Sequence, residues 1–160
     1  MIPVISIVGR SGSGKTTLVE KVVASLSKEG IRAAVIKHTR HHVDAGDEGK
    51  DSWRYRSAGA DVSLVTNERE AVVHVTFKEP VTPVVLAGMC EGIADIVIVE
   101  GYRDGNQKKI EVIDSSIDEL PLCREGIDNI IAIAADDCPM EGVPLFKRND
   151  IEGIVNFIKK

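Results

Sequence analysis

Apolar runs alternate along the chain with amphipathic segments, and their lengths distinguish strands from helices. Short apolar runs predict strands at residues 2–8, 31–36, 61–66, 71–77, 95–99, 109–113 and 129–134. Apolar residues at helical spacing predict helices at residues 16–29 and 149–160. A short helix is expected at residues 51–58, where Asp51 or Ser52 can act as the cap, and residues 80–90 begin with prolines and then become helical. Such alternation is typical of a three-layer α/β fold, in which helices cover both faces of a mostly parallel central sheet.

Two of these strands are joined by only the polar turn at residues 67–70, which predicts a β-hairpin extension. Apolar residues of its second strand alternate with His74 and Thr76, which suits an exposed arm able to join the sheet of a second copy. No repeat or low-complexity tract interrupts the chain. We therefore expect residues 1–160 to form a single domain.

Composition narrows the class of protein. The 160 residues are 43% hydrophobic and 28% charged, as in a soluble globular protein, and the net charge of −5 argues against broad binding of nucleic acid. No apolar run approaches the ~20 residues of a membrane-spanning helix, and the first residues lack the basic region of a signal peptide. We expect a cytoplasmic protein that binds neither nucleic acid nor a membrane.

The stretch GRSGSGKT, at residues 9–16, satisfies the P-loop pattern GxxxxGK[ST], with the required strand before it and helix after it. Its glycines let backbone N–H groups turn toward phosphate oxygens, and the positive end of the helix dipole points at the same anion. The lysine reaches the β- and γ-phosphates, and the threonine hydroxyl can ligate Mg²⁺. We expect the phosphates to be bound by Gly9, Ser11, Gly12, Ser13, Gly14, Lys15, Thr16 and Thr17.

A P-loop site also needs an acid near the magnesium ion. The strand DIVIVE has acids at both ends, Asp95 and Glu100, roughly 16 Å apart at the rise of a strand. Ligands of open α/β sheets bind beyond the carboxyl ends of the strands. We therefore expect Glu100 to hold Mg²⁺ together with Thr16 and to act with Lys15 as a catalytic residue, while Asp95 lies at the far edge.

The second strand leads into the polar loop KHTRHHVD, at the same edge of the sheet. Lys37 and His38, nearest the strand end, are expected to contact the nucleotide, and Asp44 is a candidate catalytic acid that positions water. A zinc site formed by His38, His41, His42 and Asp44 is the alternative for this loop.

The strand at residues 129–134 is followed by paired acids. Many guanine-specific P-loop proteins use an aspartate in their last loops to bind the base, and Asp136 is the candidate here. The chain has no NKxD motif, so these residues leave the choice between guanine and adenine open.

The segments GRSGSGKTTL, VIKHTRHH, GKDSWRYRSAGA and IVIVEGY together resemble the molybdopterin-guanine dinucleotide biosynthesis protein B family (MobB). The resemblance implies a homodimeric, GTP-binding P-loop protein that uses Mg²⁺ and hydrolyses GTP slowly at most. Its partner would be the guanylyltransferase that joins GMP to molybdopterin, with molybdopterin itself a second candidate ligand. Two other functions stay open: a P-loop kinase of small molecules, whose lid would be residues 103–109, and a nucleotide-dependent metal chaperone using the histidine-rich loop.

Overall fold

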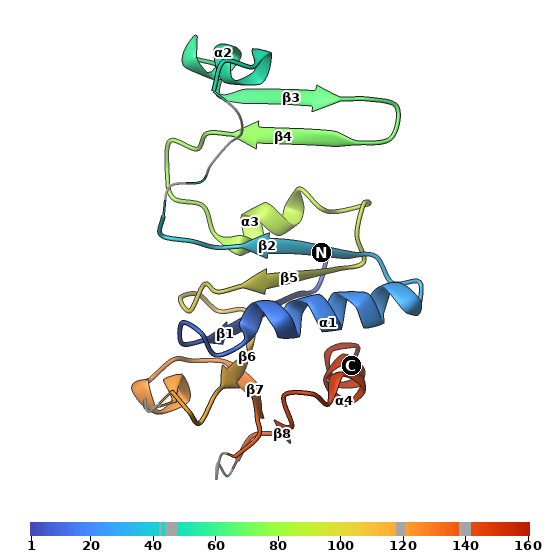
Figure 1. Ribbon diagram of the computed structural model, residues 1–160, viewed down its shortest axis with the longest axis vertical. Coiled ribbons are helices and arrows are strands. Elements are labelled where there is room, and N and C mark those ends of the chain that lie inside the picture. Colours follow the sequence, from blue (N-terminus) through green and yellow to red (C-terminus); the bar gives the residue numbers. More distant parts are fainter. Residues whose placement is uncertain (42, 44–47, 118–120, 138–141) are drawn as a thin grey trace. The chain divides into compact units, whose positions relative to one another are not determined.

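The computed structural model describes residues 1–41, 43, 48–117, 121–137 and 142–160 (Figure 1). These fall into two compact units, one formed by residues 1–38 and 82–160 and the other by residues 39–81. Units of this kind can belong to one domain, so the expectation of a single domain over residues 1–160 stays a prediction.

The first unit is built on a six-stranded parallel sheet with the order β2-β5-β1-β6-β7-β8. Its strands are β1 (Val4–Gly9), β2 (Ala33–Lys37), β5 (Ile96–Glu100), β6 (Lys108–Ile113), β7 (Ile130–Ala135) and β8 (Leu145–Phe146). The central strand β1 is buried over almost its whole length, as continuous apolar runs in parallel sheets require. The first strand in sequence therefore forms the middle of the sheet.

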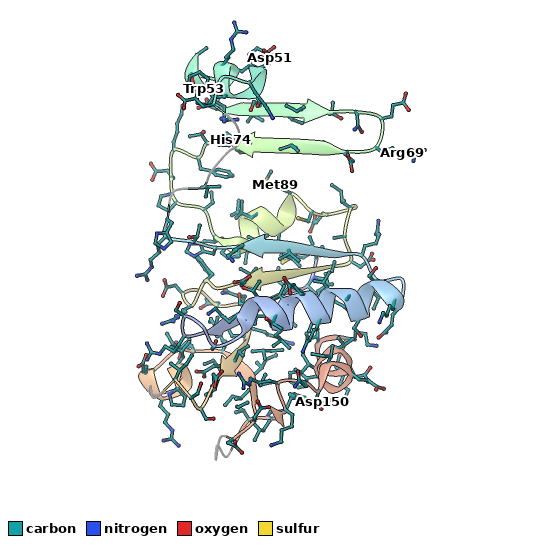
Figure 2. The ribbon with its side chains drawn as sticks, viewed as in Figure 1. Asp51, Trp53, Arg69, His74, Met89 and Asp150 are labelled. Carbon is teal, nitrogen blue, oxygen red and sulfur yellow. The ribbon has the colours of Figure 1, made fainter. Side chains whose placement is uncertain are left out.

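Helices cover the sheet unequally. On one face, α1 (Lys15–Lys28) and α4 (Ile151–Ile158) pack on the larger apolar core, which includes Ile7, Leu26 and Ile98. On the other face, α3 (Pro83–Gly88) packs with Val97, Val99 and the ring of Tyr102 in a smaller core. Asp150 caps α4 by accepting a hydrogen bond from the Gly153 N–H at 3.0 Å, and it is labelled in Figure 2.

The second unit contains α2 (Asp51–Ser57) and the antiparallel hairpin of β3 (Val62–Thr66) and β4 (Ala71–Val75). Its turn is closed by the Asn67 side chain, which accepts hydrogen bonds from the N–H groups of Arg69 and Glu70. Arg69 and His74 are labelled in Figure 2. Apolar side chains on both strands are largely exposed, with Val72 at 71% and Leu64 at 59% of their full area.

The predicted α/β fold, with a parallel central sheet and a hairpin extension, is confirmed. The segment at residues 80–90 becomes helical after its first prolines, as predicted, and Thr82 caps the helix Pro83–Gly88. Two details differ. No sequence pattern predicts β8, which has two residues, or the 3₁₀ helix η1 (Leu122–Glu125), because neither is long enough to show a period. Among the described residues, no helix has the length and apolar character needed to cross a membrane.

Candidate functional site

The register of the parallel sheet brings the predicted site residues to one edge. Glu100, the last residue of β5, lies beside Ile7 of β1 on one side and beside Lys37 of β2 on the other. Gly9, the last residue of β1, lies beside Val112 of β6. The P-loop thus begins at the centre of the carboxyl edge, with strands on both sides of it.

The P-loop backbone takes the form that its glycines permit. Gly12 and Gly14 have φ angles of +81° and +91°, and Gly14 is the N-cap residue of α1. Lys15 Nζ donates to the carbonyl of Arg10 across the loop at 2.6 Å. The Ser13 side chain is only 1% exposed, and its hydroxyl has no hydrogen-bond partner within the described part of the chain. A buried hydroxyl without a partner at a helix N-terminus fits a bound anion.

Thr16 and Glu100 meet although they are far apart in sequence. The Thr16 hydroxyl donates to Glu100 Oε1 at 2.8 Å, and Lys37 Nζ lies 3.4 Å from the same oxygen. The Glu100 side chain is 11% exposed, so this carboxylate is nearly removed from bulk water. A hydroxyl and a carboxylate at this distance are the two oxygen ligands, direct or through water, that a P-loop offers to Mg²⁺.

Charged side chains act on the P-loop lysine. Partial burial lowers the pKa of Lys15, Glu100 opposes that shift, and the charges of Arg103 and Lys37 add to it. Two further positive side chains, Arg103 and Lys37, thus act on Lys15 against a single acid, Glu100. Such an excess of positive charge suits a polyphosphate, which brings several negative charges.

The turn after Glu100 has an unusual backbone. Gly101 and Tyr102 have φ angles of +86° and +58°, the latter rare for a side chain of that size. A Cβ atom at Gly101 would lie 3.2 Å from the carbonyl oxygen of His38. The His38 N–H donates to the Glu100 carbonyl, and its ring meets the Tyr102 ring edge-on at 4.9 Å. The ends of β2 and β5 are therefore joined at the residues KH and EGY.

The following segment, residues 103–109, is fastened to the body of the unit. Arg103 Nη2 donates to the Gly9 carbonyl at 3.0 Å, directly at the start of the P-loop. The Gln107 amide donates to the carbonyls of Tyr102 and Asp104. Lys109, 1% exposed, donates to the carbonyls of Gly105 and Asp128, at 2.7 and 2.8 Å. A kinase lid must open and close, and these bonds hold the segment in place.

A cavity of about 270 Å³ adjoins the P-loop on the side of β6 and β7. Arg148 Nε donates to Asp136 Oδ2 and Arg148 Nη1 to Asp114 Oδ2, each at 2.7 Å. Hydrogen bonds from Arg148 lower the pKa of Asp136, while those from Ser116 and Arg148 lower the pKa of Asp114 to about 2. Both carboxylates are therefore acceptors only at neutral pH. The cavity lining includes Thr17, Lys21, Val112, Asp136, Arg148 and Asn149.

The structure brings most of the predicted residues to this edge. The P-loop residues, Glu100 and Lys37 lie together, and Asp136 lies beside the loop across the cavity. The His38 ring, in contrast, contacts Tyr102. Asp44 and His42 lie outside the described residues, and their predicted roles stay predictions. In the described part of the chain, no three side chains of His, Cys, Asp or Glu gather as a metal site.

Two residues of the site were not predicted. The sequence places Arg103 in a candidate lid at residues 103–109, and no motif singles out Arg148. The sequence holds one usable signal for Arg103, its position three residues after the acid of β5. Arg148 has none, because its acidic partners are 12 and 34 residues away and follow no motif.

Residues 4–136 match the family model described as molybdopterin guanine dinucleotide synthesis protein B. The chain is 35% identical to the molybdopterin-guanine dinucleotide biosynthesis adapter protein of Haemophilus influenzae, over 99% of this chain and 88% of that protein. The protein of the same name from Escherichia coli is 33% identical, over 99% and 92%. The crystal structure of Bacillus subtilis MobB superposes with a TM-score of 0.76 at 26% identity, covering 99% of this chain and 96% of that one. The MobB homologue of Bacillus stearothermophilus gives 0.71 at 28%, covering 98% and 97%. With its P-loop, its EGY turn and its parallel sheet, this chain belongs to the MobB family of molybdopterin-guanine dinucleotide synthesis proteins.

Proposed function

We propose that this chain is an adapter protein of molybdopterin-guanine dinucleotide biosynthesis that binds GTP with Mg²⁺ at its P-loop. The observation that carries the proposal is the Thr16 hydroxyl, 2.8 Å from Glu100 at the end of the neighbouring strand, beside a complete P-loop. Relatives that share about a third of its residues over nearly their whole length bear the name of such adapters. The fold alone would not indicate this function, since P-loop folds host many activities.

The residues present fit both the phosphates of GTP and Mg²⁺. The buried Ser13 hydroxyl, the N-terminal N–H groups of α1 and the Lys15 ammonium supply donors for phosphate oxygens. Thr16 and Glu100 would hold Mg²⁺, which neutralises charge on the β- and γ-phosphates when it is bound. Lys37 already forms an ion pair with Glu100 and would neutralise the charge of the carboxylate before the metal binds. The proposal includes slow hydrolysis of GTP at most.

The proposed partner is the guanylyltransferase that attaches GMP to molybdopterin, with molybdopterin as a further ligand. Within this scheme the chain would present nucleotide or cofactor to the transferase in the cytoplasm. Co-purification of the two proteins in the presence of Mg²⁺ and GTP, and its loss in a Lys15→Ala variant, would support this part of the proposal. Equal co-purification with and without nucleotide would contradict it.

Calorimetric titration tests nucleotide binding directly. GTP and ATP are each titrated with and without Mg²⁺ into the wild type and the variants Thr16→Ala and Glu100→Gln. The exposed Glu20→Gln on α1 serves as a matched control. We expect GTP to bind more tightly than ATP, and Mg²⁺ to strengthen binding in the wild type and the control but not in the two site variants. Failure of the wild type to bind GTP, or an unchanged Mg²⁺ effect in Glu100→Gln, would refute the proposal.

We also propose that the chain forms a homodimer through its hairpin. A hairpin of two strands is marginally stable in water unless its apolar face is covered. Here Val62, Leu64, Val65, Val72 and Val73 all expose about half of their area or more. Both edges of this two-stranded sheet are open within the described residues, which is the arrangement that a second copy can extend.

Light scattering coupled to size exclusion measures the oligomeric state. The wild type is expected at twice the chain mass of 17.3 kDa. A Leu64→Asp/Val72→Asp variant places charges on the hairpin and should elute as a monomer. A Lys28→Asp change at the end of α1 is the control for added negative charge. A wild type that is monomeric at all concentrations would refute the dimer.

A further inference from the structure

The sheet order determines which end of a nucleotide lies over which strands. Thr16, Glu100 and Lys37 lie on the β5 and β2 side of the P-loop, whereas the cavity lies on the β6 and β7 side. A Mg²⁺ ion held by Thr16 and Glu100 would neutralise charge at the β- and γ-phosphates, so the γ end of the nucleotide would lie on the side of Glu100. The base is at the opposite end of the nucleotide and would therefore extend toward the cavity. This step rests on the proposed function.

Among the groups that line that cavity, Asp136 and Arg148 combine an acceptor and a donor suited to a base. The Asp136 carboxylate accepts one hydrogen bond on each oxygen, from Arg148 Nε at 2.7 Å and from the Arg148 backbone N–H at 3.3 Å. Each oxygen has room for another donor, since a carboxylate has about four acceptor sites. Arg148 uses Nε and Nη1 for its two acids, while the described residues give Nη2 no partner. The Asp136 carboxylate, as acceptor, and Arg148 Nη2, as donor, therefore lie side by side.

The guanidinium is held in one orientation. Asp114 accepts from Arg148 Nη1 at 2.7 Å, and the Ser116 hydroxyl and N–H in turn donate to the other oxygen of Asp114. Lys21 Nζ donates to the Asn149 side chain, so α1 is tied to the residue that follows Arg148. Because the Arg148 guanidinium is held from two sides, it is preorganised for binding, and little conformational freedom is lost when a ligand binds.

We propose that Arg148, fixed between Asp136 and Asp114, is a specificity-determining residue that donates to guanine O6 while Asp136 accepts from the N1 and N2 groups. Guanine presents an acceptor at O6 and donors at N1 and N2, which matches this pair. Adenine presents a donor at N6 and lacks the N2 amino group, so it makes fewer bonds here. Read in this way, the base is recognised without an NKxD motif.

Nucleotide titrations of three variants test the inference. Arg148→Gln and Arg148→Lys remove the fixed fork, and Arg69→Gln at the hairpin turn is the matched control. We expect Arg148→Gln to lower the GTP-to-ATP affinity ratio about ten- to a hundredfold, since a hydrogen bond with a charged partner is lost. Arg148→Lys should recover only part of it. Tripolyphosphate, which has no base, should bind the wild type and all three variants equally.

A fourth variant reverses the preference. Asp136→Asn offers an amide N–H to the oxygen that xanthine carries in place of the guanine N2 amino group, so XTP should gain on GTP. The outcomes separate the two proposals. A wild type that binds no nucleotide refutes the proposed function itself. A wild type that prefers GTP, together with Arg148→Gln that keeps the ratio within about twofold or weakens tripolyphosphate to the same degree, overturns this inference and leaves the proposed function standing.

Discussion

Replacing Gly9 with alanine should destabilise the first unit severely, for reasons that the P-loop pattern does not express. The residue has φ +153°, and an added Cβ would lie 2.7 Å from Ser13 Oγ and nearer still to the Val112 carbonyl oxygen. Carbon and oxygen normally approach no closer than about 3.3 Å, so β1 and β6 would have to separate. Overpacking costs about 1–3 kcal/mol and a backbone conformation reserved for glycine about 1–3 more. We therefore expect a loss of about 2–6 kcal/mol, a large share of the stability of a domain.

Gly14→Ala is the matched comparison, because no atom lies within 4 Å of its added Cβ. Only the left-handed backbone at φ +91° is penalised, by about 1–2 kcal/mol. Urea unfolding followed by far-ultraviolet circular dichroism measures both variants. The single tryptophan, Trp53, lies in α2 of the second unit, so its fluorescence would follow the wrong part of the chain. Equal losses in the two variants, or an unchanged midpoint for Gly9→Ala, would refute the steric argument.

Three further predictions concern helix capping and charge. Asp150→Ala removes the bond from the Gly153 N–H and should cost about 1 kcal/mol in urea unfolding, most of which Asp150→Ser should restore. The pKa of Asp114 is held at about 2, below its unfolded value, so the stabilisation is complete above about pH 4 and is lost as pH falls toward 2. The difference in unfolding free energy between the wild type and Arg148→Gln should therefore shrink over that interval, and a constant difference would contradict the ion pair. Burial lowers the pKa of Lys15 from its usual 10.5, so the lysine loses its charge earlier as pH rises. When the pH is raised, tripolyphosphate affinity should therefore begin to fall before pH 10.5 in the wild type but not in Lys15→Arg.

The part of the site that the sequence predicts is the part carried by local patterns. The P-loop is contiguous, and its lysine and threonine follow directly from it. Glu100 is 84 residues from Thr16, yet it could be predicted because carboxyl ends of parallel strands share one edge. Its strand is an unbroken apolar run that ends at an acid, which is a signal that sequence preserves.

Other features follow from tertiary packing and leave no local pattern. The charges around the cavity come from three loops after β6, after β7 and before α4, and only the folded sheet brings them together. Lys109 reads as a polar residue at a strand start, whereas the fold buries it to satisfy two carbonyls. The β8 strand exists only because β7 offers it an edge, and two residues carry no period.

The central position of β1 has a consequence for biosynthesis. This strand leaves the ribosome before the other strands of its sheet, and its neighbours β5 and β6 begin only at residues 96 and 108. At about 5–20 residues per second, the chain waits on the order of 5–20 s before β1 can pair on both sides. During that time an apolar strand is exposed, and contacts of such long sequence separation also slow folding itself. The nascent chain should therefore depend on chaperones, and the P-loop, although translated early, becomes competent late.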